Sequence, residues 1–124
     1  MFEIRVKAEF SSAHRLLEND GICGRLHGHN WEVEVFFQAR QLQKDEMVVD
    51  FLDIEKKLKE ITLSLDHKNL NEVPYFLNKN PTAELIAKHI FEELDVLSQQ
   101  DVFWLGRVRV WENQWYHATY WKTE

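Results

Sequence analysis

The chain has 124 residues, 44% of them hydrophobic, and a formal net charge of -6 at pH 7. This length suits a single core, so we expect one domain over residues 1–124. The negative charge and the lack of a Lys/Arg block argue against nucleic acid or an anionic membrane surface as a partner. No apolar run approaches the roughly 20 residues of a membrane span, and residues 1–10 do not resemble a signal peptide. We therefore expect a cytoplasmic protein.

Two segments in the first third of the chain have the two-residue period of β-strands. From Phe2 to Phe10, even-numbered apolar residues alternate with charged ones. In the second segment the odd-numbered apolar residues alternate with glutamates, which predicts a strand from about His27 to Ala39. The polar residues 41–47 then form a turn or loop.

Two helices are predicted in the middle of the chain. In residues 50–65 the apolar side chains recur at helical spacing, and Asp50 lies where the first amides of a helix require acceptors. A second helix follows the segment 71–82 and ends before Gln99. Its N-cap is expected to be Asn80 or Thr82, with Pro81 in the first turn.

The last segments return to the strand pattern, and together the elements define a fold class. Residues 106–112 and 115–121 are predicted strands, with Asn113 and Gln114 as the turn between them. The order ββααββ predicts an α+β protein in which two helices cover one face of a four-stranded antiparallel sheet. Because the other face and the edges need cover, we expect a homo-oligomer.

Three histidines are expected to meet at one end of this sheet. His27 and His29 lie two residues apart, so they project from the same face of the second strand. The inward positions of the first strand lead to His14, which lies nearby if the two strands form a hairpin. A single histidine is more often an isolated polar residue, but three neutral imidazoles are the ligand set of a catalytic Zn2+ with one open position.

Four further residues are candidates for chemistry. Cys23, the only cysteine, precedes His27 by four residues, and it is either a fourth zinc ligand or a thiolate beside the metal. Asp66 next to His67 can fix a tautomer and raise basicity, although such a pair is also typical of a solvated turn after a helix. Glu112 ends an inward apolar row, where a carboxylate needs donors, unless it turns to water.

Several motifs together resemble one family over nearly the whole chain. FSSAHRL, CGRLHGHN, LDHKNLN, NPTAEL and VRVWENQWYHATY occur in the order and spacing of the 6-pyruvoyltetrahydropterin synthase / 6-carboxytetrahydropterin synthase family. The step from Cys23 to His27 is similar to the bacterial 6-carboxy-5,6,7,8-tetrahydropterin synthase branch, which acts in queuosine precursor synthesis. The resemblance implies the tunnelling fold (T-fold), an oligomeric barrel, commonly a hexamer built as a dimer of trimers, with active sites between subunits.

The resemblance also implies a reaction and a role for each candidate residue. The substrate would be 7,8-dihydroneopterin triphosphate, and a carbon-carbon lyase reaction would release acetaldehyde and triphosphate. Two alternatives are the pyruvoyl-forming reaction on the same substrate and a non-catalytic protein that binds pterin or zinc. The implied roles are zinc ligation by His14, His27 and His29, catalysis by Cys23, Asp66 and His67, and pterin anchoring by Glu112.

A few positions depart from the family pattern or leave their roles open. Asn113 stands where Thr is usual, and Leu85 stands where Asn is frequent. Glu84 is interpreted as a first-turn residue of its helix, where carboxylates are favoured. Arg15 and Arg25 lie beside the histidine motifs and are as consistent with solvated side chains as with triphosphate binding.

Overall fold

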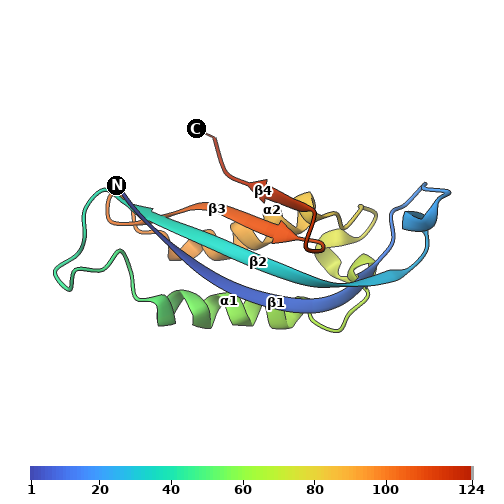
Figure 1. Ribbon diagram of the computed structural model, residues 1–124, viewed down its shortest axis with the longest axis horizontal. Coiled ribbons are helices and arrows are strands. Elements are labelled where there is room, and N and C mark those ends of the chain that lie inside the picture. Colours follow the sequence, from blue (N-terminus) through green and yellow to red (C-terminus); the bar gives the residue numbers. More distant parts are fainter. Residues whose placement is uncertain (124) are drawn as a thin grey trace.

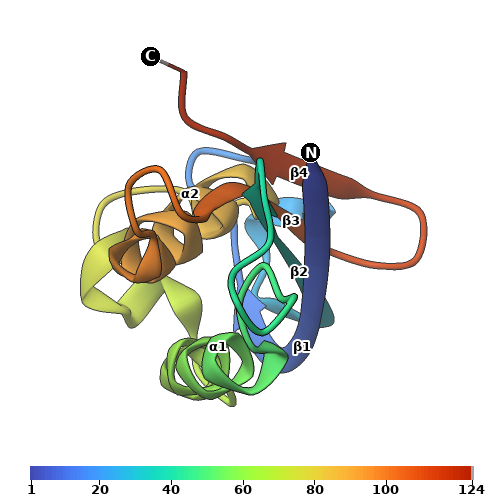
Figure 2. The same cartoon turned by 90° about the vertical axis from the view of Figure 1, so that its left-hand side faces the viewer.

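The structure, a computed structural model, describes residues 1–123. Two helices, α1 (Phe51–Leu65) and α2 (Ala83–Leu94), lie on the same face of one sheet (Figure 1 and Figure 2). The predicted architecture is therefore confirmed. Within residues 1–123, no helix combines the length and the apolar character that crossing a membrane requires. The sheet is antiparallel, in the order β1-β2-β3-β4, and its strands are β1 (Phe2–His14), β2 (His27–Ala39), β3 (Trp104–Trp111) and β4 (His117–Tyr120).

The alternation predicted for the first two strands is present in their pairing and burial. β1 and β2 pair along their full length, from Phe2 opposite Ala39 to His14 opposite His27. The odd-numbered apolar residues of β2, including Trp31, are fully buried against the helices. Because side chains alternate between faces, this register also sets which face the histidines at the strand ends occupy.

Helix α1 begins where the sequence predicts. The Asp50 carboxylate accepts a hydrogen bond from the Leu52 N–H at 2.9 Å, which satisfies one of the free amides of the first turn. Its buried stripe lies at helical spacing and faces the sheet. Burying each such side chain contributes roughly 1.5–3 kcal/mol. The stripe comprises Ile54, Leu58, Ile61 and Leu65.

The N-cap of α2 is Thr82, and the alternative prediction of Asn80 is wrong. The Thr82 hydroxyl accepts from the Leu85 N–H at 3.1 Å, and Pro81 precedes the cap instead of lying in the first turn. Asn80 is engaged elsewhere, because its side-chain oxygen accepts from the Leu17 N–H at 2.6 Å. The helix ends before residue 99 as predicted, and a single 3-10 turn (η4, Asp95–Leu97) follows it.

The last hairpin differs from the prediction in the length of its connection. The predicted turn residues, Asn113 and Gln114, lie in a connection that spans 112–116, so β4 begins at His117 and not at residue 115. The Asn113 side-chain oxygen accepts from the N–H groups of Trp115 and Tyr116, at 2.8 and 2.9 Å. These bonds hold both aromatic residues in the loop and out of the strand.

The face of the sheet opposite the helices carries paired charges. Glu34 is 6% exposed and accepts hydrogen bonds from Arg5 Nη1 at 3.0 Å and from Trp111 Nε1 at 2.5 Å. Burial opposes ionisation of Glu34, but these donors hold its pKa below the ordinary value. Nearby, the Arg107 guanidinium lies 4.0 Å from the centroid of the Phe36 ring. Charged side chains on the face opposite the helices therefore have partners within the same sheet.

Candidate metal centre

Strand pairing brings the three predicted histidines to one point. His14 is the last residue of β1 and lies opposite His27, the first residue of β2, while His29 lies opposite Ser12. The three ring centroids are 4.7 to 5.1 Å apart. One nitrogen from each ring lies within 4.8 Å of the others, a group that can hold a metal ion. The structure therefore assembles the predicted cluster from the β1–β2 hairpin.

The orientation of two rings is fixed from outside the cluster. Nδ1 of His14 lies 2.7 Å from the carbonyl oxygen of Pro81, and Nδ1 of His27 lies 2.7 Å from that of Arg25. A carbonyl oxygen accepts only from an N–H, so in both rings Nδ1 carries a proton and Nε2 carries a lone pair. Such bonds typically orient metal-ligating histidines.

The inner nitrogens fit a metal ion better than they fit the surrounding protein. Nε2 of His14 and Nε2 of His29 are buried and have no hydrogen-bond partner in the described chain. Burial lowers the pKa of both rings below the ordinary value, which favours the neutral form that binds metals. Small rotations would bring the three rings to the roughly 3.4 Å nitrogen separation of a tetrahedral zinc site.

Glu112 lies against this cluster. It directly follows β3, and its Oε1 atom is 3.4 Å from His14 Nε2 and 3.5 Å from His29 Nε2. Its backbone N–H donates to the Tyr116 carbonyl oxygen at 3.0 Å, which fixes the start of the loop. The inward direction predicted for Glu112 is correct, but its position directly beside two histidines was not predicted.

A cavity of about 350 Å³ opens next to the cluster. His14 and Glu112 form one side, and the first turn of α2 with the β3–β4 hairpin forms the other. Glu84 lies in that first turn, as interpreted from the sequence, and it also lines the cavity. Sequence reasoning missed the lining residues Thr82 and Tyr116, although both belong to motifs of the family resemblance.

Asp66 and His67 form the predicted pair. Oδ2 of Asp66 lies 2.8 Å from His67 Nδ1, and its Oδ1 accepts from the Ser11 N–H at 2.8 Å. The Ser11 N–H, followed by the His67 side chain, holds the pKa of Asp66 below its ordinary value. His67 has a φ of 54° and an 82% exposed side chain. A left-handed backbone at a non-glycine residue is uncommon and is often found at functional sites.

Cys23 lies in a short 3-10 turn (η1, Ile22–Gly24) between β1 and β2. Its side chain is partly buried, and its carbonyl oxygen accepts from the Leu16 N–H at 2.7 Å. The turn requires glycine at position 24, because a Cβ there would lie 1.7 Å from the Asn19 carbonyl oxygen. Within residues 1–123, none of the hydrogen bonds or ion pairs joins Cys23 to Asp66 or His67.

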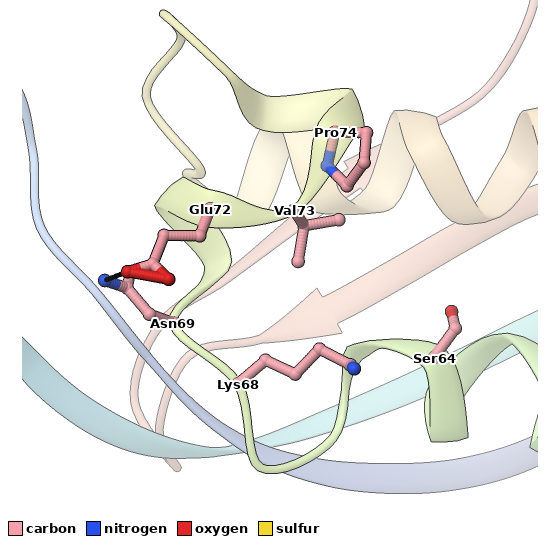
Figure 3. Close-up of a pocket in the computed structure, with 6 residues that line it drawn as sticks. All are labelled: Ser64, Lys68, Asn69, Glu72, Val73 and Pro74. Atoms are coloured by element: carbon pink, nitrogen blue, oxygen red, sulfur yellow. Dashed lines mark hydrogen bonds between the residues drawn. The ribbon is translucent and has the colours of Figure 1, made fainter.

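A second cavity, of about 380 Å³, lies at the end of α1, where the residues after the Asp66–His67 pair in the chain line it (Figure 3). Lys68 and Ser64 line it, and Asn69 Nδ2 donates to Glu72 Oε1 at 3.3 Å across its rim. Asn69 also caps the 3-10 turn η2 (Leu70–Glu72). None of the predicted site residues lines this cavity, so we assign the site to the histidine cluster.

Comparison with known proteins agrees with the geometry. The model of the family described as 6-pyruvoyl tetrahydropterin synthase matches residues 3–123. The chain is 31% identical over 111 residues to the 6-carboxy-5,6,7,8-tetrahydropterin synthase of Rickettsia conorii, covering 76% of this chain and 80% of that protein. It is 32% identical over 124 residues to the 6-pyruvoyl tetrahydrobiopterin synthase of Homo sapiens, covering 89% and 84%.

The solved structures confirm the fold that the resemblance implies. The 6-pyruvoyl tetrahydropterin synthase of Caenorhabditis elegans superimposes with a TM-score of 0.85 at 26% identity, over 98% of this chain and 96% of that one. The four-stranded sheet with two helices on one face is therefore the T-fold. Motifs, fold and family match agree, and the chain belongs to the 6-pyruvoyl tetrahydropterin synthase family.

Proposed function

We propose that this protein is a zinc-dependent lyase that converts 7,8-dihydroneopterin triphosphate and water to 6-carboxy-5,6,7,8-tetrahydropterin, acetaldehyde and triphosphate. The observation that carries the proposal is the cluster of His14, His27 and His29 beside a cavity that Glu112 also lines. The short step from Cys23 to His27 and the relatives named 6-carboxy-5,6,7,8-tetrahydropterin synthase favour this product. We place the reaction in queuosine biosynthesis in the cytoplasm.

Glu112 would orient the substrate. An ionised carboxylate offers two acceptor oxygens in one plane, which match the N–H donors on the 2-aminopyrimidinone edge of a pterin. The cavity beside Glu112 has about 350 Å³, a volume in the range of small-ligand sites. The ring would therefore lie between the first turn of α2 and the β3–β4 hairpin, with its side chain directed to the histidines.

The remaining residues would bind the metal and move protons. Zn2+ held by His14, His27 and His29 would supply Lewis-acid chemistry that polarises the side-chain hydroxyls and acidifies the adjacent C–H bond. Asp66 is ionised at neutral pH and holds His67 Nδ1–H, so that His67 Nε2 is the atom available for proton transfer. Cys23 would act as the thiol on the other side of the substrate.

The separation of Cys23 from the Asp66–His67 pair favours an oligomer. Within residues 1–123 no hydrogen bond or ion pair joins these groups, and the His67 side chain is 82% exposed. We propose that Cys23 of one subunit and the Asp66–His67 pair of another meet at one active site, in a homo-oligomer that we expect to be a hexamer formed from two trimers.

The pyruvoyl-forming reaction is a second candidate, supported by the 32% identity to the human 6-pyruvoyl tetrahydrobiopterin synthase. Incubation of zinc-loaded protein with dihydroneopterin triphosphate, with mass spectrometry of the pterin and an acetaldehyde assay, separates the two. We expect 6-carboxytetrahydropterin and acetaldehyde in equal amounts. A pyruvoyl product without acetaldehyde would assign the sister reaction, and ligand binding without turnover would indicate a non-catalytic protein.

A further inference from the structure

The contact between Glu112 and the histidines leaves two buried ring nitrogens without a hydrogen-bond partner, and a cation between them and the carboxylate would satisfy them. His14 donates from Nδ1 to Pro81, so its Nε2 atom presents a lone pair to the Glu112 carboxylate 3.4 Å away. His29 Nε2 lies 3.5 Å from the same oxygen and is equally without a hydrogen-bond partner. A buried polar nitrogen without a partner costs free energy, and here two of them lie beside one carboxylate.

Among the described residues, the Glu112 carboxylate has no other charged partner. Within residues 1–123 its ion pairs are with His14 and His29 alone, and no Lys or Arg lies within ion-pair distance. A divalent ion bound by the histidines would satisfy the carboxylate and the inner nitrogens together. Carboxylate oxygens are ordinary zinc ligands, and three histidines leave one position to fill.

The same carboxylate cannot hold that position while it anchors a pterin. The side chain and the pyrimidinone edge lie at opposite ends of the pterin ring system. If the side-chain hydroxyls reach the metal, the pyrimidinone edge therefore lies a full ring system away from it. Glu112 then has to turn away from the histidines toward the cavity. Its side chain is 30% exposed and lines that cavity, so it has room to rotate.

We propose that Glu112 is the fourth ligand of the metal when the cavity is empty, and that it exchanges the metal for the pterin ring when substrate binds. The exchange rests on the function proposed above, whereas the ligation in the empty site does not. The carboxylate would keep the metal four-coordinate between turnovers. When Glu112 leaves the metal to bind the pterin ring, it would free the coordination position that the substrate hydroxyls then occupy.

Zinc affinity of the ligand-free protein tests the ligation without turnover. Metal-free wild type, Glu112→Gln and Glu84→Gln are titrated with Zn2+ in competition with a chromophoric chelator. Glu84 is the matched control, because it lines the same cavity and has no ion pair with the histidines in the described chain. We expect Glu112→Gln to bind zinc about 10-fold or more weakly, as when a supporting partner is lost, and Glu84→Gln to bind like wild type. Equal affinity of all three proteins would overturn the ligation.

Two further measurements show whether a change in zinc affinity reflects loss of a ligand and not a change in the fold. Glutamine is close in size to glutamate and keeps the backbone bond to Tyr116, so circular dichroism should show an unchanged fold. The visible spectrum of the Co2+-loaded protein should change in Glu112→Gln but not in Glu84→Gln, and an identical spectrum would also count against the ligation.

Crystal structures of the zinc-loaded wild type test the exchange. We expect the Glu112 carboxylate on the metal in the ligand-free crystal, and on the ring when neopterin, which lacks the triphosphate, is bound. A carboxylate that stays on the metal beside bound neopterin would overturn the exchange. The two proposals can fail separately. If Glu112→Gln binds zinc more weakly but the wild type does not turn over dihydroneopterin triphosphate, the ligation stands and only the proposed function is contradicted.

Discussion

His14 Nδ1 and the carbonyl oxygen of Pro81 lie 2.7 Å apart, although one residue ends the first strand and the other precedes the second helix. This bond directs the lone pair of His14 Nε2 into the cluster. The ring is 1% exposed, so it has no alternative partner in water. The segment before α2 therefore sets the direction of the proposed metal ligand on β1.

Replacing His14 by Gln should remove metal binding. The variant loses one of three nitrogens, so zinc affinity should fall by more than the 10- to 100-fold range that is typical of losing an outer-shell partner. Equilibrium dialysis with Zn2+ measures it. His117→Gln is the matched control, because His117 lines the same cavity but does not belong to the cluster. Normal zinc binding by His14→Gln would contradict the assignment.

Replacing Cys23 by Ala should retain zinc and remove turnover. The thiol is proposed to act on the substrate beside the metal, so its loss should lower kcat by about 10²- to 10⁴-fold, as for removal of a proton-transfer group. Steady-state kinetics and metal analysis of the same preparation test both parts. If zinc is lost, Cys23 is itself a ligand, and Glu112 is then not needed as the fourth.

Replacing Asp66 by Asn should lower turnover with little change in zinc content. The amide can still accept from the Ser11 N–H, but it would place an NH2 group against His67 Nδ1 and favour the wrong tautomer. We expect kcat to fall by about 10²-fold or more. Asp101→Asn is a suitable control, because Asp101 is exposed and its positive φ suits asparagine. An unchanged kcat would exclude Asp66 from catalysis.

His89 should contribute to the pH dependence of stability. It packs against the rings of Tyr75 and Phe76, at centroid distances of 4.2 and 5.6 Å. Burial lowers the pKa of His89 below its ordinary value of 6.5, and the carboxylates of Glu93 and Glu92 only partly oppose this shift. The unfolded chain therefore binds a proton at higher pH than the folded chain, and stability falls as pH drops through 6.5.

The His89→Gln variant isolates this contribution. Urea unfolding of the metal-free wild type and variant between pH 8 and pH 5 gives the free energy of unfolding of each protein. As the pH falls, this free energy should decrease more for the wild type than for the variant. Lys57 and Glu60 face the same cavity as His89, and the comparison cancels their titration because both proteins contain them. Parallel stability curves over this range would contradict a lowered pKa for His89.

The sequence predicts the histidine cluster because the two-residue period and hairpin pairing act over short distances in the chain. It does not predict features that depend on distant contacts. Asn80 has the character of a helix cap, yet it bonds to the Leu17 N–H far away in the chain, and Thr82 takes the cap. Glu112 was placed on the correct face, but its distance from His29 depends on how β3 ends beside β2. In the proposed assembly, the relation of Cys23 to His67 depends on a second subunit.

The bond from His14 to Pro81 gives the proposed metal a further effect, as a cross-link. An ion bound by His14, His27 and His29 would close the loop of residues 15–26, and through Pro81 it would also hold the entry to α2. A chain with one cysteine has no internal disulfide to do this. Chelation should therefore expose the loop to trypsin at Arg15 and Arg25, which lie at its two ends.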